Sequence, residues 1–376
     1  MLPGRPLPEV VADILSLEGA LLENSADGCL EFVAPRPLSR MLALPEHGKL
    51  VFAHQPCGPE ALYAGYDSEF FQAVANIFTS KGRLAMASYP GISVSPEKIS
   101  ASIREKIVLA NGTFRLKDME TRPTTYLLGF FKYAALSDEK REGLFVLLAH
   151  GLNGAVSSPG ENLSRILPEL TESNPKFLPP APEIERALQA ACAAAPAFAA
   201  TDLAPYIKSV DRRLNRDGKR VFEYYEALKS ETQRGMERKA VGGEDSPDKN
   251  RDKLEAIESE KKWKIQDLVS KYSMNIRIEL IAAVGISTFS TFNCIEIRRR
   301  LSSRTYPVTF NPLIRNLDPL PCESCYYPRG GLHLCDEKLH ILCAACLQKC
   351  PQCAKPFCPV CHKKGCPRCT KGKPKI

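Results

Sequence analysis

The chain has 376 residues, 44% of them hydrophobic and 25% charged, which is ordinary for a folded globular protein and excludes a wholly disordered chain or a membrane bundle. The formal net charge is +8, and the length suits two or three compact units, each with a core of its own. The longest apolar stretches, residues 126–136 and 276–286, are well short of the roughly 20 residues that cross a bilayer, so we expect no membrane partner.

The first 24 residues contain acidic side chains where a secretory signal needs a basic start followed by an uninterrupted apolar stretch. We therefore expect a cytoplasmic protein. In a reducing compartment, its fifteen cysteines would serve as thiols and metal ligands rather than as disulfides.

Residues 1–172 are predicted to form an α+β domain. Apolar positions at helical spacing predict helices over 8–24 and 67–80. Short runs of apolar residues predict four strands: 50–53, 84–88, 126–135 and 144–150. The last two strands flank a polar loop, which suits an antiparallel hairpin.

Residues 173–200 are rich in proline and alanine, which predicts a linker and a helix. Over residues 201–285, apolar side chains recur at three- and four-residue steps in two runs, separated by a break at 241–249 that contains glycine and proline. Two long helices joined by a short polar turn are most simply an antiparallel coiled-coil hairpin. Its charged outer face is typical of a structural arm, with a homodimer contact as the alternative.

Residues 286–320 are predicted to form a β-hairpin, because the run IEIRRRLSSRTYPVTF alternates about a turn at Ser302 and Ser303. Alternation places about half of its arginines on either face, and we expect them to be solvated, with nucleic-acid contact as the alternative. These arginines are Arg298, Arg299, Arg300 and Arg304.

Residues 321–376 contain cysteines and a histidine at metal-ligand spacing. Five Cys-x2-Cys pairs lie within 48 residues, and such a pair forms a tight turn that presents two thiolates to one ion. Twelve ligands make three sets of four, so we predict a multi-zinc domain with about three ions, with an iron–sulfur cluster as the competing interpretation. The predicted ligands are Cys322, Cys325, Cys335, His340, Cys343, Cys346, Cys350, Cys353, Cys358, Cys361, Cys366 and Cys369.

The spacing leaves open which of these pairs share an ion. The ligand order resembles a RING-type cross-brace, in which the first ion would take Cys322, Cys325, Cys343 and Cys346. The second ion would then take Cys335, His340, Cys350 and Cys353. A third, ribbon-like site would take Cys358, Cys361, Cys366 and Cys369. Three sequential ribbons are the alternative, and in either arrangement His333 and His362 are expected to be bystanders.

Sets of four protein ligands leave no coordination position for water or substrate, which favours structural metal. The chain also lacks the phosphate-loop, dinucleotide-binding and hydrolase motifs, so we expect no enzyme activity. Residues 321–376 hold ten Lys and Arg against three acidic residues, and this charge of +7 favours nucleic acid as a partner. The candidate contact residues are Lys363, Lys364, Arg368, Lys371, Lys373 and Lys375.

Four segments follow one another along the chain: YDSEFFQAVANIF, TTYLLGFFKYAALSDEKREGLFVLLAHG, KFLPPAP and KYSMNIRIELIAA. Over residues 30–285 this order resembles the accessory C-terminal region of bacterial Swi/Snf-type helicase-like ATPases, the family of the RNA-polymerase-associated ATPase. The cysteine-rich end that begins in TFNPLIRNLDPLPCESC is similar to the end of some members. Both nucleotide-binding lobes of that family are absent here. The resemblance therefore implies a subunit that works with a separately encoded helicase-like ATPase.

The leading interpretation is a non-enzymatic zinc-binding accessory protein that acts with this ATPase on nucleic acid. A RING-like ligase adaptor is the first alternative, and it requires an exposed apolar groove beside the metal ligands. The second alternative is a purely structural dimer held by the coiled coil, with zinc as a structural cross-link.

Overall fold

The computed structural model describes residues 5–24, 29–52, 61–80, 83–92, 94–172, 178–241, 247–327 and 330–370. The chain divides into two compact units, residues 1–85 and 86–376, which are described separately below. Helices and sheets both occur, in agreement with the predicted α+β class. The division falls inside the domain predicted over residues 1–172, because the strands after residue 86 pair with strands from much later in the chain.

The first unit packs three helices against a four-stranded sheet of order β1-β2-β3-β4, in which only β3 and β4 are parallel. Its core includes Val11, Phe32 and Ile77. The helix predicted over 8–24 ends at Leu17, because Gly19 adopts a φ of +88° and the chain continues as a strand. The elements are α1 (Leu7–Leu17), β1 (Leu21–Asn24), β2 (Leu30–Val33), α2 (Arg36–Leu42), β3 (His47–Val51), β4 (Ala61–Tyr63) and α3 (Glu69–Ser80).

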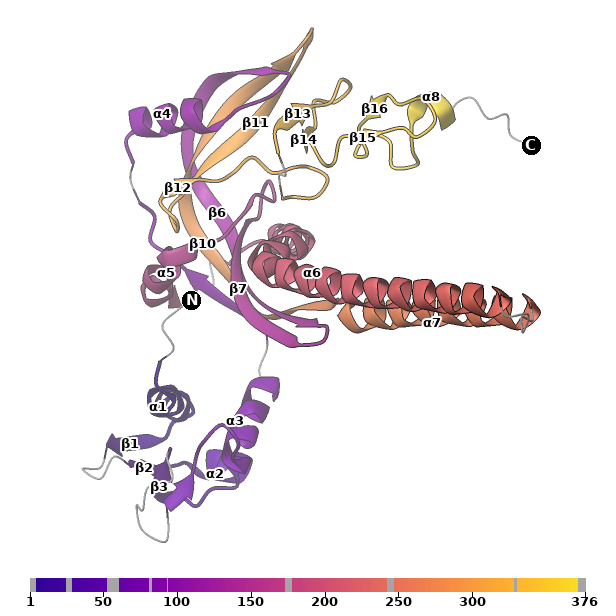
Figure 1. The fold of residues 1–376 in the computed structure, drawn as a ribbon. Helices are drawn as coiled ribbons and strands as arrows, with labels where there is room; N and C mark the ends of the chain where they lie inside the picture. The colour runs from indigo at the N-terminus through magenta and orange to yellow at the C-terminus, as the bar shows by residue number, and fades with distance from the viewer. Residues whose placement is uncertain are drawn as a thin grey trace, which may run out of the picture. The chain divides into compact units, whose positions relative to one another are not determined.

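The second unit is built on a mixed-length sheet of order β12-β11-β10-β6-β7-β8, which β5 and β9 extend beside β10 (Figure 1). Its strands are β5 (Leu84–Ser88), β6 (Thr113–Leu136), β7 (Lys140–His150), β8 (Val156–Ser157), β9 (Thr171–Glu172), β10 (Asn275–Arg299), β11 (Ser302–Asn311) and β12 (Asn316–Leu317). Its helices are α4 (Pro96–Lys106), the short 3₁₀ turn Gly160–Asn162, α5 (Leu163–Glu169), α6 (Ala181–Val241) and α7 (Pro247–Tyr272). The cysteine-rich end adds β13 (Leu332–Leu334), β14 (Ile341–Cys343), β15 (Gln348–Lys349), β16 (Pro356–Phe357) and α8 (Pro367–Thr370).

The centre of this sheet is the antiparallel pair of β6 and β10, matched from Thr113 opposite Arg298 to Leu136 opposite Asn275. Residues 275–285, predicted as the end of the coiled coil, are therefore strand. The predicted hairpins are present: β6 pairs with β7, and β10 pairs with β11. The second hairpin turns at Arg300 and Leu301, two residues earlier than predicted, because Arg299 pairs with Ser302.

Both faces of the sheet are covered, and alternate residues of β6 and β7 face opposite sides. Leu127, Leu147 and Ala149 contact the start of α6. Their sequence neighbours Leu128 and Leu148 pack in the cluster that contains α5. The hydrophobic run TYLLGFFKYAA is thus buried on both sides in its middle, which explains why it lacks the polar alternation of a surface strand.

Helix α6 runs without interruption from Ala181 to Val241, although the sequence suggested a division at residue 200. Pro196 and Pro205 lie inside it. Its first half is rich in alanine, and these small side chains, such as Ala187 and Ala194, are fully buried against the sheet. By length and composition alone, α6 among the described helices is apolar enough to cross a membrane, and its apolar window is 44% buried by the rest of the protein.

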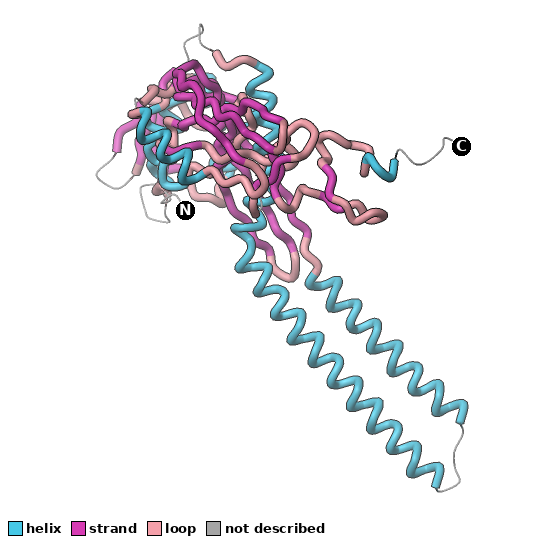
Figure 2. Tube along the Cα trace, turned by 90° about the horizontal axis from the view of Figure 1, so that it is seen from above, coloured by secondary structure: helices cyan, strands magenta, loops and turns pink. Residues whose placement is uncertain are grey.

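The second half of α6 leaves the sheet and lies antiparallel beside α7 (Figure 2). Glu226 binds Lys261 at 2.6 Å, and the hydroxyl of Tyr272 donates to Asp217 at 2.7 Å. The structure does not show the coiled-coil hairpin predicted over 201–285. Helix α6 is one helix that already begins at residue 181, and residues 275–285 belong to strand β10.

One cysteine in the first unit departs from the expectation of reduced thiols. Cys29 is buried, with 3% of its surface exposed, and it is disulfide-bonded.

Candidate metal centres

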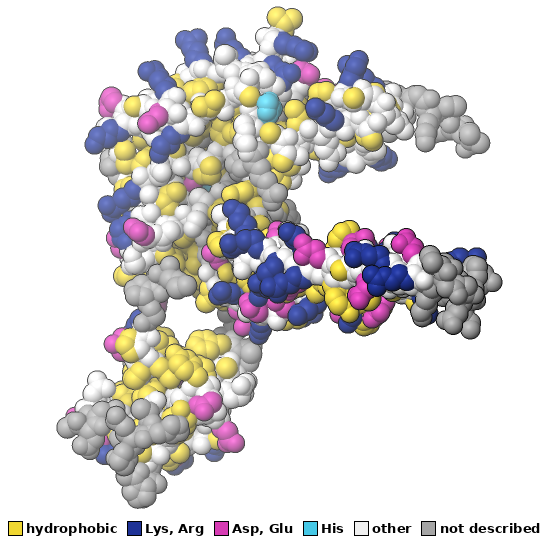
Figure 3. Space-filling model, viewed as in Figure 1, with side chains coloured by type: hydrophobic (Ala, Val, Ile, Leu, Met, Phe, Trp, Pro, Cys, Tyr) yellow, Lys and Arg dark blue, Asp and Glu magenta, His cyan; other side chains and the backbone are white. Residues whose placement is uncertain are grey.

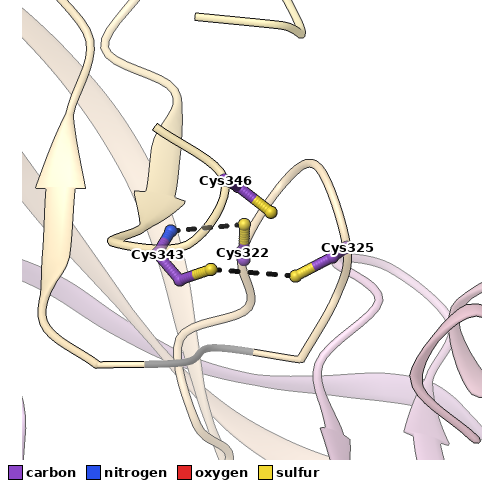
Figure 4. Close-up of side chains that lie close together, drawn as sticks. All are labelled: Cys322, Cys325, Cys343 and Cys346. Carbon is purple, nitrogen blue, oxygen red and sulfur yellow. Dashed lines mark hydrogen bonds between the residues drawn. The ribbon is translucent and has the colours of Figure 1, made fainter. Parts of the chain in front are cut away.

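The first centre contains four cysteines whose sulfur atoms point toward one another (Figure 4). Two come from the loop after β12, and two come from the end of β14 and the turn that follows it. The sulfurs of Cys325 and Cys343 lie 3.9 Å apart, and the backbone N–H of Cys343 donates to the sulfur of Cys322 at 3.3 Å. The four residues are Cys322, Cys325, Cys343 and Cys346.

The second centre is the mixed one. Cys335 and His340 lie at the loop end of the β13–β14 hairpin, where the N–H of Cys335 donates to the carbonyl of His340. Nδ1 of His340 lies 3.2 Å from the sulfur of Cys361 and 3.7 Å from that of Cys358, both of which follow β16. The set is Cys335, His340, Cys358 and Cys361.

The third centre joins the turn after β15 to helix α8. The sulfurs of Cys350 and Cys369 are 3.7 Å apart, and those of Cys353 and Cys366 are 3.8 Å apart. In each of the three centres two ligands are buried and two are half-buried, so each set encloses its centre. The set is Cys350, Cys353, Cys366 and Cys369.

The Cys-x2-Cys sequence repeats one local structure. At four of the pairs, the N–H of the residue after the second cysteine donates to the carbonyl of the first, closing a tight turn. Tyr326 and Ala354, which close two of these turns, have φ values of +60° and +53°, a left-handed conformation that lets the chain reverse. The four bonds are Tyr326 to Cys322, Leu347 to Cys343, Ala354 to Cys350 and His362 to Cys358.

The separations fit a single tetrahedral ion in each centre. With zinc–sulfur bonds of about 2.3 Å, two sulfurs of a tetrahedron are about 3.8 Å apart, and a nitrogen ligand lies about 3.6 Å from a sulfur. The sulfur–sulfur distances here are 3.7 to 3.9 Å, and the distances from His340 Nδ1 are 3.2 to 3.8 Å. A disulfide needs about 2.05 Å, so these sulfurs are not bonded to each other.

The electrostatics show what a bound cation would have to offset. Burial, followed by repulsion from Cys335, raises the pKa of the Cys361 thiol to about 12, and burial raises the pKa of Cys346 to about 11. Burial lowers the pKa of His340, which favours the neutral ring that can offer a lone pair to a metal. Thiolates crowded in this way are stable together only when a divalent ion compensates their charge.

The structure brings together every ligand predicted from the sequence, but it corrects the pairing. The first set of the RING-type arrangement is right. Cys350 and Cys353 were assigned to the second centre, which instead closes with Cys358 and Cys361. Sequential ribbons are also wrong, because each set combines pairs separated by ligands of another set. Among the described residues, the three groups include neither His333 nor His362.

Sequence reasoning missed the residues that fasten the first centre to the sheet. The guanidinium of Arg304 on β11 donates two parallel hydrogen bonds to Glu323, both at 2.8 Å. Glu323 lies between Cys322 and Cys325, and it also accepts the N–H of Ile341 at 2.6 Å. Arg304 is therefore a half-buried brace and not a solvated arginine. The sequence signal that could have indicated this contact is the acidic Glu323 between two cysteines, together with the basic residues of the predicted hairpin.

A second brace holds the β13–β14 hairpin. The side chain of Asn111 accepts the N–H of Leu334 at 2.7 Å and donates to its carbonyl at 3.1 Å. Arg299, the last residue of β10, binds Asp336 at 2.8 Å, so it too is not simply solvated.

Three of the candidate nucleic-acid contact residues lie in the described part of the chain: two follow Cys361 of the second centre, and one lies in α8 of the third. Lys363, Lys364 and Arg368 are exposed. Lys371, Lys373 and Lys375 lie outside the described residues.

A comparison with protein-family models finds no match, and a comparison with curated proteins finds none either. The resemblance to helicase-associated regions therefore rests on the segments quoted above.

Proposed function

We propose that this chain is a non-enzymatic, zinc-binding accessory protein that acts with a helicase-like ATPase on nucleic acid. The observation that carries the zinc assignment is the convergence of three four-ligand sets, in each of which all ligand atoms lie within 4.8 Å of one another. In an iron–sulfur cluster the cysteines are spread over several iron atoms, whereas one ion draws four ligands to one point.

The ions act here as structural cross-links. Each would join two turns that are far apart in sequence, in a segment that has few apolar residues to bury. Because each set supplies four protein ligands, no coordination position is left for a substrate. The chain's own residues then do the remaining work: they close the turns, brace the first centre against β11 and present basic side chains outward.

The nucleic-acid part of the proposal is supported by charge. Lys363, Lys364 and Arg368, between the second centre and the end of the third, are exposed, and the whole segment carries +7. Acidic surfaces are the partners that such a segment attracts, and a phosphate backbone offers the densest one. The ATPase partner is proposed from the resemblance alone. A RING-like adaptor is less favoured, because the second ligand set departs from the RING pairing.

The metal assignment is tested by purifying the full chain without added metal and measuring zinc and iron by elemental analysis. We expect about three zinc ions per chain and no stoichiometric iron. Iron in place of zinc, or fewer than two ions, would contradict the assignment.

The nucleic-acid role is tested by the salt dependence of binding to a fluorescent DNA duplex and a single strand. Reversing three charges together, Lys363→Glu, Lys364→Glu and Arg368→Glu, should reduce the log–log salt slope by about 0.9 for each phosphate that these side chains neutralise. The matched control reverses three exposed charges on α6: Lys208→Glu, Lys219→Glu and Arg220→Glu. A flat salt response of the unmodified chain would contradict nucleic-acid binding.

The partner is tested by adding the chain to a helicase-like ATPase that lacks its own C-terminal region. We expect a change in its nucleic-acid-stimulated ATP hydrolysis, and no change at any ratio would contradict the partnership.

A further inference from the structure

The turn of the β10–β11 hairpin exposes one apolar side chain completely. Leu301 has a relative exposure of 105%, the highest among the exposed large hydrophobic residues in the described part of the chain. It occupies the second position of a two-residue loop between Arg299 and Ser302. Figure 3 shows several Lys and Arg side chains gathered at the upper edge of the second unit, where Figure 1 draws the turn between β10 and β11.

The loop residues are poorly suited to the turn that they make. Arg300 has a φ of +53°, a left-handed conformation for which hairpin loops favour glycine or asparagine. Placing a side chain there costs on the order of 1 kcal/mol. Neither Arg300 nor Leu301 belongs to the core cluster beneath the hairpin, whose burial would offset this cost. Burial in the core therefore does not explain the Arg-Leu pair.

The charges near the tip are mostly positive. Arg298 and Arg300 are exposed, with 53% and 74% of their side-chain surface accessible. The ion pair of Arg300 with Asp336 is open to solvent on both sides, and such a pair is weak enough to exchange for phosphate. Arg298 donates to Glu296, whose side chain is only 14% exposed and also binds Lys117, so Glu296 keeps a basic partner if Arg298 turns to a phosphate. On the adjoining strand β6, Arg115 is exposed opposite Glu296.

The tip is also held in place. Strand β6 pairs with β10 as far as Arg298. Only one residue pair of the β10–β11 hairpin, Arg299 with Ser302, extends beyond this third strand. The side chain of Arg299 points back, binding Asp336 at 2.8 Å and donating to the carbonyl of Leu334. Because these contacts hold the tip in one position, it can displace the groups of a partner that it meets, whereas a loop without them would move aside.

We propose that this tip is a wedge for duplex nucleic acid, in which Leu301 inserts between base pairs while Arg298 and Arg300 neutralise the flanking phosphates. Apolar wedges flanked by basic residues are how proteins unstack base steps and bend a duplex. The wedge deepens the nucleic-acid part of the proposed function and rests on it. It names a duplex as the substrate and adds a contact at the hairpin to the one proposed for the zinc-bound end.

The experiment uses the full chain and DNA duplexes with 2-aminopurine placed at successive central positions, because this base becomes fluorescent when it is unstacked. We expect binding to raise the fluorescence several-fold at one or a few positions. Leu301→Ala should remove most of this rise while changing the dissociation constant by less than about tenfold. The matched control is Leu144→Ala, which truncates an exposed leucine of β7 in the same unit. Arg298→Ala and Arg300→Ala should each lower the salt slope by about 0.9.

The outcomes separate the wedge from the proposed function. If the chain binds duplex without a fluorescence rise, or if Leu301→Ala behaves like Leu144→Ala, the wedge is overturned and nucleic-acid binding stands. Binding to single strands alone would also overturn it. If neither duplex nor single strand binds, both proposals fail.

Discussion

At the residue scale, the most unusual polar group is Asp318, which is buried in the second unit. The hydroxyl of Tyr126 and the side-chain amide of Asn311 each donate to its carboxyl at 2.8 Å. Burial raises its pKa to about 7, because the two donors do not offset the loss of water. Nearby, burial lowers the pKa of His150 to about 3, so its ring remains neutral.

We predict that Asp318 makes the protein less stable as pH rises from about 4 to 7. In this range the folded state holds a proton that the unfolded chain has released, so the free energy of unfolding falls with increasing pH. Its contribution is complete below pH 4 and lost above pH 7, and the change is on the order of a few kcal/mol. His150 acts in the opposite direction, gaining stability as pH rises from about 3 to 6.5.

The measurement compares the wild-type chain with Asp318→Asn by denaturant unfolding at several pH values. His150 contributes equally to both proteins, so the difference isolates Asp318. The variant should gain stability relative to wild type between pH 4 and 7, and a difference that does not change with pH would contradict the prediction.

The brace between Arg304 and Glu323 gives a second prediction at this scale. Arg304→Lys keeps the charge but cannot make two parallel hydrogen bonds, so the metal-loaded chain should lose about 1–2 kcal/mol of unfolding free energy. Arg298→Lys, at an exposed position, is the control and should cost less than about 0.5 kcal/mol. Equal losses in the two variants, measured by denaturant titration, would show that the paired geometry contributes nothing.

At the element scale, the sequence predicts elements whose determinants are local. Both hairpins, helix α3 and the cysteine turns follow from periodicity and spacing. The pairing of β6 with β10 does not, because a strand does not encode which distant strand it joins. The continuity of α6 was missed for a related reason: burial of its alanine-rich half against the sheet stabilises the helix despite Pro196 and Pro205.

The long helix gives a prediction at this scale. Gly218 lies inside α6, and an added Cβ would meet no atom within 4 Å. Gly218→Ala should therefore stabilise the helix by about 1 kcal/mol. Amide hydrogen exchange in the α6–α7 arm should slow by about fivefold, since the arm opens locally.

The control is Gly285→Ala in β10, where the added Cβ would lie 2.6 Å from the sulfur of Met86. This variant should destabilise the sheet. Faster amide hydrogen exchange in the α6–α7 arm of Gly218→Ala would contradict the prediction that a methyl group at this position stabilises the helix.

At the scale of the whole molecule, the second unit connects the sheet to three centres in series. The first centre is bonded to β11 of the sheet through Glu323, and the β13–β14 hairpin, which carries the second, is bonded to Asn111, shortly before β6. The third centre is built from β15, β16 and α8, and it is linked to the others through Cys358 and Cys361. All twelve ligands were predictable because cysteine spacing is local. Their pairing was not, because it depends on two small hairpins that bring distant turns together.

This series predicts unequal effects of removing single ligands. Cys366→Ser disrupts only the outermost centre, so the chain should keep two of its three ions and unchanged hydrogen exchange in β11 and β14. Cys322→Ser removes a fully buried ligand next to Glu323. It should lose the first ion, release the brace on Arg304 and speed exchange throughout the β13–β14 hairpin.

Metal content by elemental analysis and exchange by mass spectrometry measure both effects in the same preparations. The two variants remove the same kind of ligand, so a generic effect of losing a cysteine would appear in both. If Cys366→Ser also released the first two ions, the centres would form one cooperative cluster rather than a series anchored at the sheet. The anchored series is expected because the polar contacts to β11 and Asn111 belong to the first two centres.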